Sequence, residues 1–185
     1  TADGGAVVTG DPDQAERLRR LRSLGIERTA SRRLRENGGP YRDSHEIAEV
    51  GYRYEMNELH AAIGLAQLPL LAEQNARRRQ IADAYRSGLA GVPGLELLRG
   101  DAPDRRSSHH LFAVLADERK RLAAALHERG VEAGVHYPVN DLLRTPPGEL
   151  PAMDSFAART LSLPLHPALT DADVATVIAA VREGW

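Results

Sequence analysis

Residues 51–68 read GYRYEMNELHAAIGLAQL, and they join a polar turn that carries Arg53 to a helix with one apolar face. Asn57 is a favourable N-cap residue, and the helix dipole stabilises an anion such as Glu58 in the first turn. Apolar side chains then follow at the spacing of a single helical face, namely Leu59, Ala62, Ile63, Ala66 and Leu70. We therefore predict that this face is buried. The turn before it is suited to hold an anion, because the planar guanidinium of Arg53 matches phosphate oxygens.

Composition excludes several classes of protein. The chain has 185 residues, of which 42% are hydrophobic, and a net charge of −2, so we expect a packed core and no bulk attraction to nucleic acid or acidic membranes. No apolar window of about 18 residues occurs, so we expect no membrane span. The absence of cysteine excludes a disulfide framework and fits a cytoplasmic protein. The histidines lack the spacing of metal ligands, so no metal site is predicted.

The first part of the chain alternates short elements with a long loop. Ala6–Val8 has the pattern of a short buried strand, and Asp11 is the predicted N-cap of a helix that ends at Gly25. Residues 26–50 lack a sustained period and are predicted to form a loop. The helix that begins after Asn57 is expected to continue to about Leu89, with an interruption at Pro69.

The second part has the pattern of a smaller α/β lobe that follows a turn-rich linker at residues 100–108. We predict strands at residues 110–115, 134–137 and 160–163, a helix ending at Gly130, a loop at residues 138–151, and a last helix capped by Thr170. This order of elements indicates the α/β class.

Five blocks of sequence resemble the signatures of DegT/StrS-type sugar aminotransferases, in the order of that family. Residues 51–68 are similar to G-Y-[N/K]-Y-x-M-x-[D/E]-[L/I]-x-A-A-I-x-L-x-Q-L, and residues 2–9 (ADGGAVVT) to G-E-G-G-x-V-V-T. The remaining blocks are HLF at residues 110–112, GVEAGVHY at residues 130–137 and LSLPLHP at residues 161–167. Members of this family are pyridoxal-phosphate enzymes that aminate keto-sugars, usually attached to a nucleotide.

The resemblance implies a fold and an assembly. Residues 1–100 would be the C-terminal remainder of a large pyridoxal-phosphate-binding domain, with a long dimer or interdomain helix, and residues 101–185 a small C-terminal α/β domain. It implies a cytoplasmic homodimer with composite active sites that binds pyridoxal 5′-phosphate. The substrates would be a keto-sugar and an amino-acid donor, with glutamate expected, in antibiotic-sugar or cell-envelope synthesis.

The resemblance also assigns site residues. Arg53 would contact the cofactor phosphate of the neighbouring subunit, His136 and Tyr137 would lie at the mouth of the substrate site, and Tyr41 in the long loop would approach the substrate. Two positions depart from the family pattern. Glu55 stands where arginine is frequent, and the second histidine of H-Y-P-V-P-L-H is absent from residues 136–142 (HYPVNDL), which implies a different grip on the substrate.

No catalytic residue is assigned within the chain. The family's Schiff-base lysine precedes the G-E-G-G block, so it is expected upstream of Thr1. Lys120 is the one lysine in the sequence, and it lies in a charged helix start, where we expect a surface residue.

Two alternatives from other classes remain. One is a lysine-less relative that serves as a dimerisation or sensing module without catalysis. The other is an N-terminal nucleophile hydrolase in which the hydroxyl of Thr1 attacks and its α-amine acts as the base.

Overall fold

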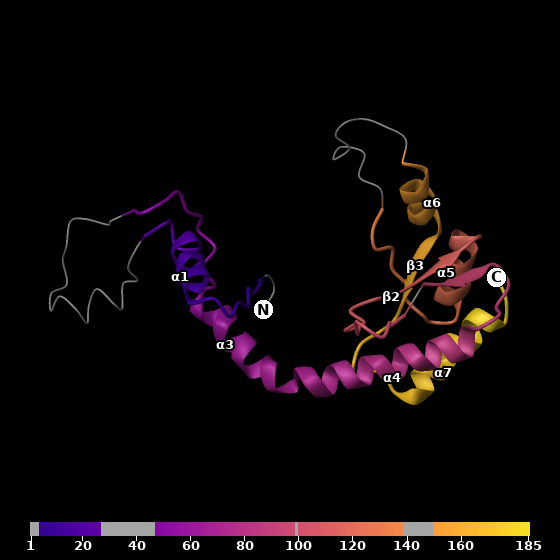
Figure 1. Ribbon diagram of the computed structural model, residues 1–185. Helices are drawn as coiled ribbons and strands as arrows, with labels where there is room; N and C mark the ends of the chain where they lie inside the picture. Colours follow the sequence, from indigo (N-terminus) through magenta and orange to yellow (C-terminus); the bar gives the residue numbers. More distant parts are fainter. Residues whose placement is uncertain (1–3, 27–46, 99, 139–149) are drawn as a thin grey trace. The chain divides into compact units, whose positions relative to one another are not determined.

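A computed structural model of the chain describes residues 4–26, 47–98, 100–138 and 150–185. These residues form two compact units, Thr1–Pro69 and Leu70–Trp185, which are described separately here (Figure 1). The division follows Pro69, whereas the sequence analysis put a domain boundary at residue 100. The reason is that Ile81, Tyr85 and Leu89 pack into the core of the C-terminal unit. The domain boundary at residue 100 stays a prediction.

The N-terminal unit contains two helices, α1 (Pro12–Leu21) and α3 (Glu58–Gln67). The predicted cap of α1 is confirmed, because the Asp11 carboxylate accepts hydrogen bonds from the backbone N–H groups of Asp13 and Gln14. The Gln14 side chain does not complete a capping box, since its Oε1 accepts a hydrogen bond from the Thr9 hydroxyl at 3.1 Å. The strand expected at Ala6–Val8 is wrong: the segment is not a strand, and Val8 is 94% exposed, because no described strand lies beside it as a partner.

Helix α3 begins as predicted, with the Asn57 side chain accepting a hydrogen bond from the backbone N–H of His60 at 2.9 Å. Its predicted buried face is not buried within the described part of the chain. Leu59 is 78% exposed and Ile63 is 49% exposed, and α3 has no buried residue. The predicted burial of this face is therefore wrong for the described residues, none of which covers it.

Pro69 interrupts the helical path, as predicted. A short 3₁₀ segment, η1 (Leu68–Leu70), separates α3 from α4 (Leu71–Leu89). The proline lacks the N–H that would continue an α-helical ladder, and the chain adopts the tighter turn there.

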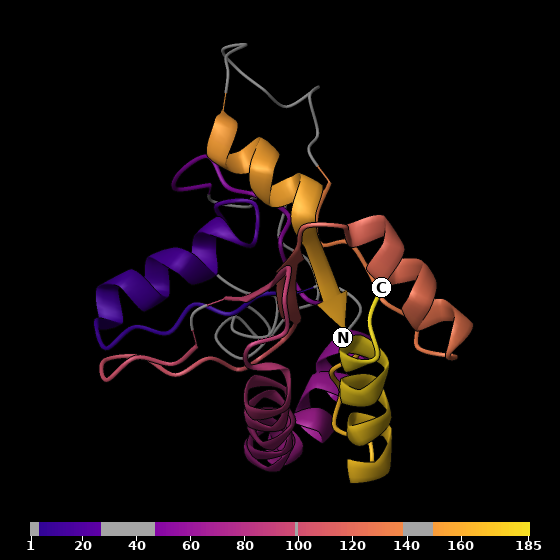
Figure 2. The same ribbon diagram turned by 90° about the vertical axis from the view of Figure 1, so that its right-hand side faces the viewer.

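The C-terminal unit is built on a three-stranded antiparallel sheet in the order β1–β2–β3. Its elements are α4, β1 (Leu95–Leu97), β2 (Phe112–Ala116), α5 (Arg119–Glu128), α6 (Pro151–Arg159), β3 (Thr160–Leu163) and α7 (Asp171–Arg182). Leu163 pairs with Phe112 and Leu161 with Val114 across β2 and β3. Helices α4 and α7 lie side by side in both ribbon views (Figures 1 and 2).

One apolar face of the sheet and three helices enclose the core. The fully buried side chains from these elements include Tyr85, Leu122, Leu126, Val114, Leu161 and Val181. The hydroxyl of Tyr85 donates a hydrogen bond to the carbonyl of Pro164 at 2.8 Å. Burial, together with the nearby Asp173 carboxylate, raises the pKa of Tyr85 to about 12. The phenol therefore stays neutral inside the core.

The C-terminal predictions are partly confirmed. The strand at 160–163 and the helix capped by Thr170 are present, and the expected strand at 110–115 appears one to two residues later as β2. The strand expected at 134–137 is wrong, since only Gly134 pairs, in a single bridge with Ser162. Pro138 has no N–H to extend such a ladder. The sequence analysis did not identify α6, although Pro151 stands at the first helical turn, a common start.

Candidate functional site

The turn that carries Arg53 is fixed by backbone hydrogen bonds to the end of α1. The N–H of Tyr52 donates to the carbonyl of Leu21 at 2.6 Å, and the N–H of Tyr54 donates to that of Arg22 at 2.9 Å. The carbonyl of Tyr52 in turn accepts from Leu24 N–H at 2.9 Å. Arg53 thus pairs with Ser23 in an isolated antiparallel bridge, which holds its backbone at a defined position.

Two glycines allow the two chain segments to approach this closely. Gly25 has a φ of +73°, and a Cβ there would collide with the carbonyl of Glu49. A Cβ on Gly51 would collide with the backbone of Gly25. The Glu49 side chain adds ion pairs to α1, with an oxygen 3.0 Å from Nη2 of Arg17 and the other 3.5 Å from Nη2 of Arg20. The base of the turn is therefore both tightly packed and charge-paired.

Arg53 itself is exposed, and it forms no ion pair with any residue that the structure describes. Its neighbours Tyr52 and Tyr54 point to the opposite side of the extended turn, as alternation along a strand requires. Their rings stack at 5.0 Å with an interplanar angle of 7°. The turn therefore presents an unpaired guanidinium on one side and an aromatic pair on the other.

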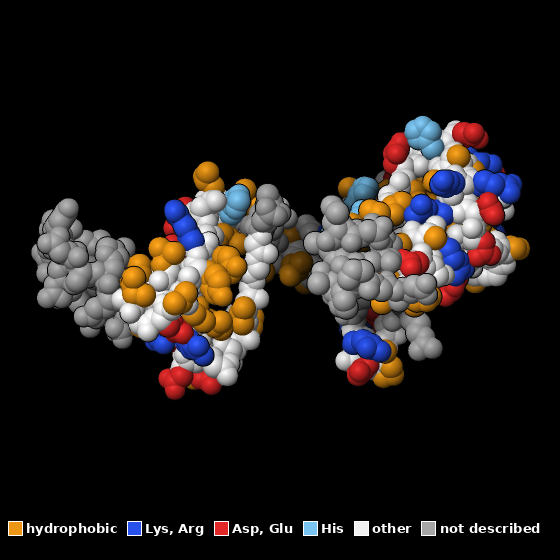
Figure 3. Space-filling model, turned by 90° about the horizontal axis from the view of Figure 1, so that it is seen from above, with side chains coloured by type: hydrophobic (Ala, Val, Ile, Leu, Met, Phe, Trp, Pro, Cys, Tyr) orange, Lys and Arg blue, Asp and Glu red, His pale blue; other side chains and the backbone are white. Residues whose placement is uncertain are grey.

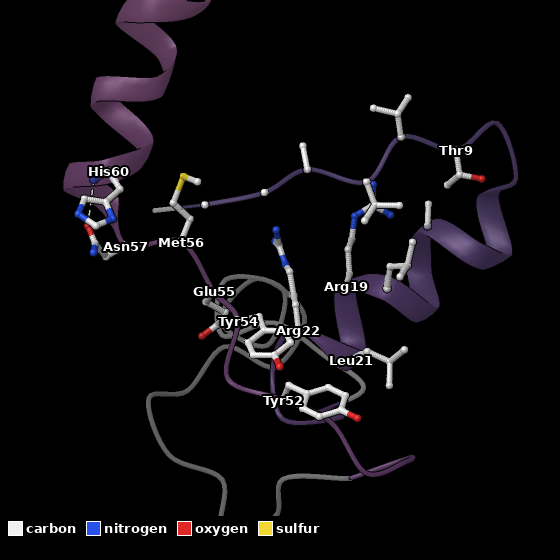
Figure 4. A pocket seen from close by; sticks show the side chains of 17 residues that line it. Thr9, Arg19, Leu21, Arg22, Tyr52, Tyr54, Glu55, Met56, Asn57 and His60 are labelled. Atoms are coloured by element: carbon white, nitrogen blue, oxygen red, sulfur yellow. Dashed lines mark hydrogen bonds between the residues drawn. The ribbon is translucent and has the colours of Figure 1, made fainter. Parts of the chain in front are cut away.

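A cavity of about 1160 Å³ lies on the side of the tyrosines. Its walls are the extended segment 4–9, the apolar side of α1 and parts of residues 52–60 (Figure 4). Arg19 and Arg22 project from α1 towards the extended segment, and the Tyr54 ring lies below them. Two cations beside an aromatic wall suit a ligand with an anionic group and a flat ring.

Glu55 also lines this cavity, and its Oε1 accepts a hydrogen bond from the Ser23 hydroxyl at 2.6 Å. A bond this short to a carboxylate is of the strong, charge-assisted kind. The carboxylate closest to Arg53 along the chain is therefore bonded to Ser23 and not to Arg53. With this departure at Glu55, no carboxylate among the described residues pairs with the guanidinium of Arg53.

Much of the surface around this site is apolar. Figure 3 shows hydrophobic side chains gathered on the N-terminal unit. The exposed hydrophobic residues of this unit include Val7, Val8, Tyr52, Tyr54 and Met56.

The predicted substrate residues His136 and Tyr137 lie in the C-terminal unit. Their rings meet edge to face, with centroids 5.2 Å apart and an angle of 88°. Tyr137 is 70% exposed, whereas the His136 ring is half-buried and its Nδ1 has no hydrogen-bond partner among the described residues. A buried imidazole nitrogen without a hydrogen-bond partner is unusual in a folded protein and calls for a structural explanation.

Other sequence predictions are placed as follows. Lys120 is exposed near the start of α5, as expected of a surface residue. Tyr41 and Thr1 lie outside the described residues. No group of three potential metal ligands occurs within the described ranges. Among the same residues, no helix is long and apolar enough to cross a membrane.

Sequence reasoning identified Arg53 but not the side chains that surround it. The aromatic pair could have been found from the spacing of Tyr52 and Tyr54, because residues two apart share one face of an extended segment. The bond between Ser23 and Glu55 joins residues 32 positions apart, and no local pattern predicts it.

A family model matches most of the chain. The model of the DegT/DnrJ/EryC1/StrS aminotransferase family matches residues 1–182. The chain belongs to this family. Its members depend on pyridoxal phosphate, and the predicted class, a mixed α/β part of a pyridoxal-phosphate transferase, is confirmed.

Two curated relatives of this family come from actinomycetes. The dTDP-3-amino-3,4,6-trideoxy-α-D-glucose transaminase of Streptomyces venezuelae is 42% identical over 98% of the chain. The erythromycin biosynthesis sensory transduction protein EryC1 of Saccharopolyspora erythraea is 35% identical, also over 98% of the chain. The chain covers 45% and 47% of these two proteins, so it spans about half the length of the relatives it matches.

A solved structure gives the same result. The crystal structure of S. venezuelae DesV in complex with a ketimine intermediate matches with a TM-score of 0.77 and 39% identity, over 95% of the chain and 45% of that protein. Family membership therefore rests on both sequence and fold.

Proposed function

We propose that the chain is the C-terminal part of a pyridoxal-phosphate-dependent aminotransferase that aminates a keto-sugar carried on a nucleotide, with glutamate as the amino donor. The family match over residues 1–182 is the observation that carries the reaction class. The name of the S. venezuelae transaminase, which refers to a dTDP-linked amino sugar, supports a nucleotide-linked substrate. Its 42% identity to the chain makes a related sugar the first substrate to test.

The described residues fit the phosphate end of the cofactor. Arg53 offers an exposed guanidinium on a backbone that is bonded to α1 on both sides, at Tyr52 and Tyr54. The bond between Glu55 and Ser23 keeps the nearest carboxylate occupied. A phosphate held here would receive charge-assisted hydrogen bonds from a donor that needs little ordering.

When bound, pyridoxal phosphate supplies an electron sink that lets an amino group pass between two carbon atoms. The chain's own contribution is binding and orientation. Arg53 anchors the phosphate, and the proton-transferring lysine is expected upstream of Thr1. His136 donates a hydrogen bond to an oxygen of the sugar, and the exposed ring of Tyr137 forms one wall of the entrance. Tyr41 remains a predicted substrate contact.

The assembly we propose is a homodimer in which each subunit supplies Arg53 to the site of the other. The exposed apolar face of α3 supports this, because Leu59 and Ile63 are 78% and 49% exposed and are covered by no described element. The small residues Ala62, Gly64 and Ala66 on the same helix allow a second backbone to approach closely. Such a face is a typical subunit interface.

The role of Arg53 is tested by titrating the full-length protein with pyridoxal phosphate. Arg53→Ala is expected to weaken cofactor affinity by roughly 10- to 100-fold, since a hydrogen bond to a charged group contributes about 1.5–3 kcal/mol. Arg53→Lys should recover part of the loss. Arg105→Ala is the matched control, because Arg105 is likewise exposed. Equal affinity in the wild type and Arg53→Ala would refute the assignment.

A second function, a sensing or dimerisation module without catalysis, is favoured by the name of EryC1, which describes a sensory transduction protein. The two functions separate in one assay with glutamate and the full-length protein. An enzyme releases 2-oxoglutarate and converts its cofactor to the amino form. A sensing module binds a ligand without either change.

A further inference from the structure

Two buried polar atoms lie without partners at one edge of the C-terminal sheet. They are Nδ1 of His136 and the hydroxyl oxygen of Ser162, and neither has a hydrogen bond to any described residue. Leaving one such group unsatisfied costs about 1–3 kcal/mol, and folded proteins rarely leave two side by side.

The backbone places these two side chains on the same face of the sheet. Gly134 and Ser162 are directly opposite each other, because Gly134 N–H donates to the Ser162 carbonyl at 3.1 Å and Ser162 N–H donates to the Gly134 carbonyl at 2.7 Å. Side chains of directly opposed residues point to one face, so a Cβ on Gly134 would point to the face of Ser162. The His136 ring lies where that Cβ would be, so it shares the face of Ser162.

The absence of a side chain at Gly134 makes room for the imidazole. A Cβ built on Gly134 would lie 2.7 Å from Cε1 of His136, 3.4 Å from Nδ1 and 3.5 Å from Nε2. The ring therefore occupies the position that a side chain of residue 134 would take, directly across the bridge from the Ser162 hydroxyl. The Ser162 hydroxyl can change its direction by rotation about the single χ1 bond.

We propose that Ser162 is a positioning residue whose hydroxyl donates a hydrogen bond to Nδ1 of His136 and fixes the imidazole as the Nε2–H tautomer. The hydroxyl proton of Ser162 has no other acceptor among the described residues. A neutral imidazole that accepts at Nδ1 carries its proton on Nε2. Nε2–H then becomes the donor to a sugar oxygen. The bond between Ser162 and His136 is independent of the proposed function. The inference rests on that function only where it names a sugar oxygen as the acceptor of the Nε2–H hydrogen bond.

Thr160 provides a matched control on the same strand and the same face. Its hydroxyl is also buried, with no partner in the described part of the chain, but residue Thr160 pairs across the sheet with Leu115 and not with Gly134. Thr160→Val removes this hydroxyl and nearly preserves the shape of the side chain. It should leave His136 unchanged.

The test is ¹⁵N NMR of the histidine rings in the full-length protein at about pH 8, above the usual histidine pKa of about 6.5. His136→Gln assigns the His136 signals. The wild type should show an unprotonated, hydrogen-bonded Nδ1 and a protonated Nε2. Ser162→Ala should shift both signals towards the average of two exchanging tautomers, Ser162→Thr should restore the wild-type pattern, and Thr160→Val should not change it.

Kinetics give a second readout. Ser162→Ala should raise KM for the sugar roughly 2- to 10-fold, the effect of one ordinary hydrogen bond, with a smaller change in kcat. Unchanged His136 signals in a folded Ser162→Ala protein would overturn the proposal. A shifted ¹⁵N pattern in a protein without aminotransferase activity would support the bond between Ser162 and His136 and refute the proposed function instead.

Discussion

The two units of the chain use similar apolar patterns with opposite results. Every buried hydrophobic side chain among the described residues belongs to the C-terminal unit, from Ile81 to Val181. In the N-terminal unit neither α1 nor α3 has a buried residue, and Val8 and Leu59 are 94% and 78% exposed. An apolar stripe therefore predicts which face of a helix can be buried. Burial also requires another element that packs against this face. The C-terminal unit contains its partners within the described residues, and the N-terminal unit does not.

The largest expected effect on stability comes from substitutions in the buried core of the C-terminal unit. Leu122→Ala or Leu126→Ala removes a fully buried side chain of α5 and should cost about 2–5 kcal/mol of stability. Ile63→Ala on α3 should cost less than about 1 kcal/mol in the 185-residue chain, because Ile63 is half exposed. Urea unfolding of the three variants measures the difference. Similar losses at Ile63 and Leu122 would show that α3 is already covered.

The next effect concerns the close approach of Gly25 to Glu49 and Gly51 in the N-terminal unit. Gly25→Ala should cost more than about 1 kcal/mol, since it adds a collision with the Glu49 carbonyl to an unfavourable positive φ. Gly10→Ala is the control, because a Cβ at Gly10 meets only open space. Amide hydrogen exchange at Tyr52 and Tyr54 should accelerate in Gly25→Ala and stay unchanged in Gly10→Ala. Unchanged amide exchange in both Gly25→Ala and Gly10→Ala would contradict the role of Gly25 in holding the turn against the end of α1.

A smaller effect on stability is expected at the helix caps, where the N-caps of α7 and α1 can be compared. Thr170→Ala should cost about 1 kcal/mol, because the Thr170 hydroxyl accepts a hydrogen bond from the Asp173 N–H at 3.1 Å. The loss should appear in the cooperative unfolding of the C-terminal unit. Asp11→Ala, at the cap of α1, should instead change local exchange, since α1 has no buried residue. Cooperative loss of stability in both variants would show that the units unfold together.

The smallest effect is a pH dependence. Hydrogen bonds from the Thr170 hydroxyl and backbone hold the pKa of Asp173 below its usual value. A carboxyl with a lowered pKa stabilises the fold above its unfolded pKa of about 3.9, and the contribution is lost as the pH falls through the folded value. Asp173→Asn should therefore flatten the acid limb of the stability curve. An identical acid limb in the wild type and Asp173→Asn would refute this linkage.

Local signals in the sequence predicted local structure well. The caps at Asp11, Asn57 and Thr170 and the interruption at Pro69 depend on neighbouring residues, and all four are present. The expected strands at Ala6–Val8 and 134–137 are absent because a strand needs a partner, and partner choice is not encoded locally.

The candidate site shows the same limit. Arg53 was assigned from its motif, and its role at the cofactor phosphate stays a prediction. The bond from Ser23 to Glu55 and the position of His136 over Gly134 depend on distant chain segments or on packing. Such contacts follow from the fold, and only the structure could supply them.

The central claim is that Arg53 serves the active site of a neighbouring subunit. It is tested most directly by mixing two full-length variants, Arg53→Ala and one that lacks the expected Schiff-base lysine, under conditions that allow subunit exchange. At a cofactor concentration that saturates the wild type but leaves Arg53→Ala mostly without cofactor, each variant alone should be nearly inactive. Mixed dimers contain one site with both residues intact, so activity should rise to about a quarter of the wild type in a random mixture. A mixture no more active than the sum of its parts would place Arg53 and the lysine in the same subunit's site and contradict the claim.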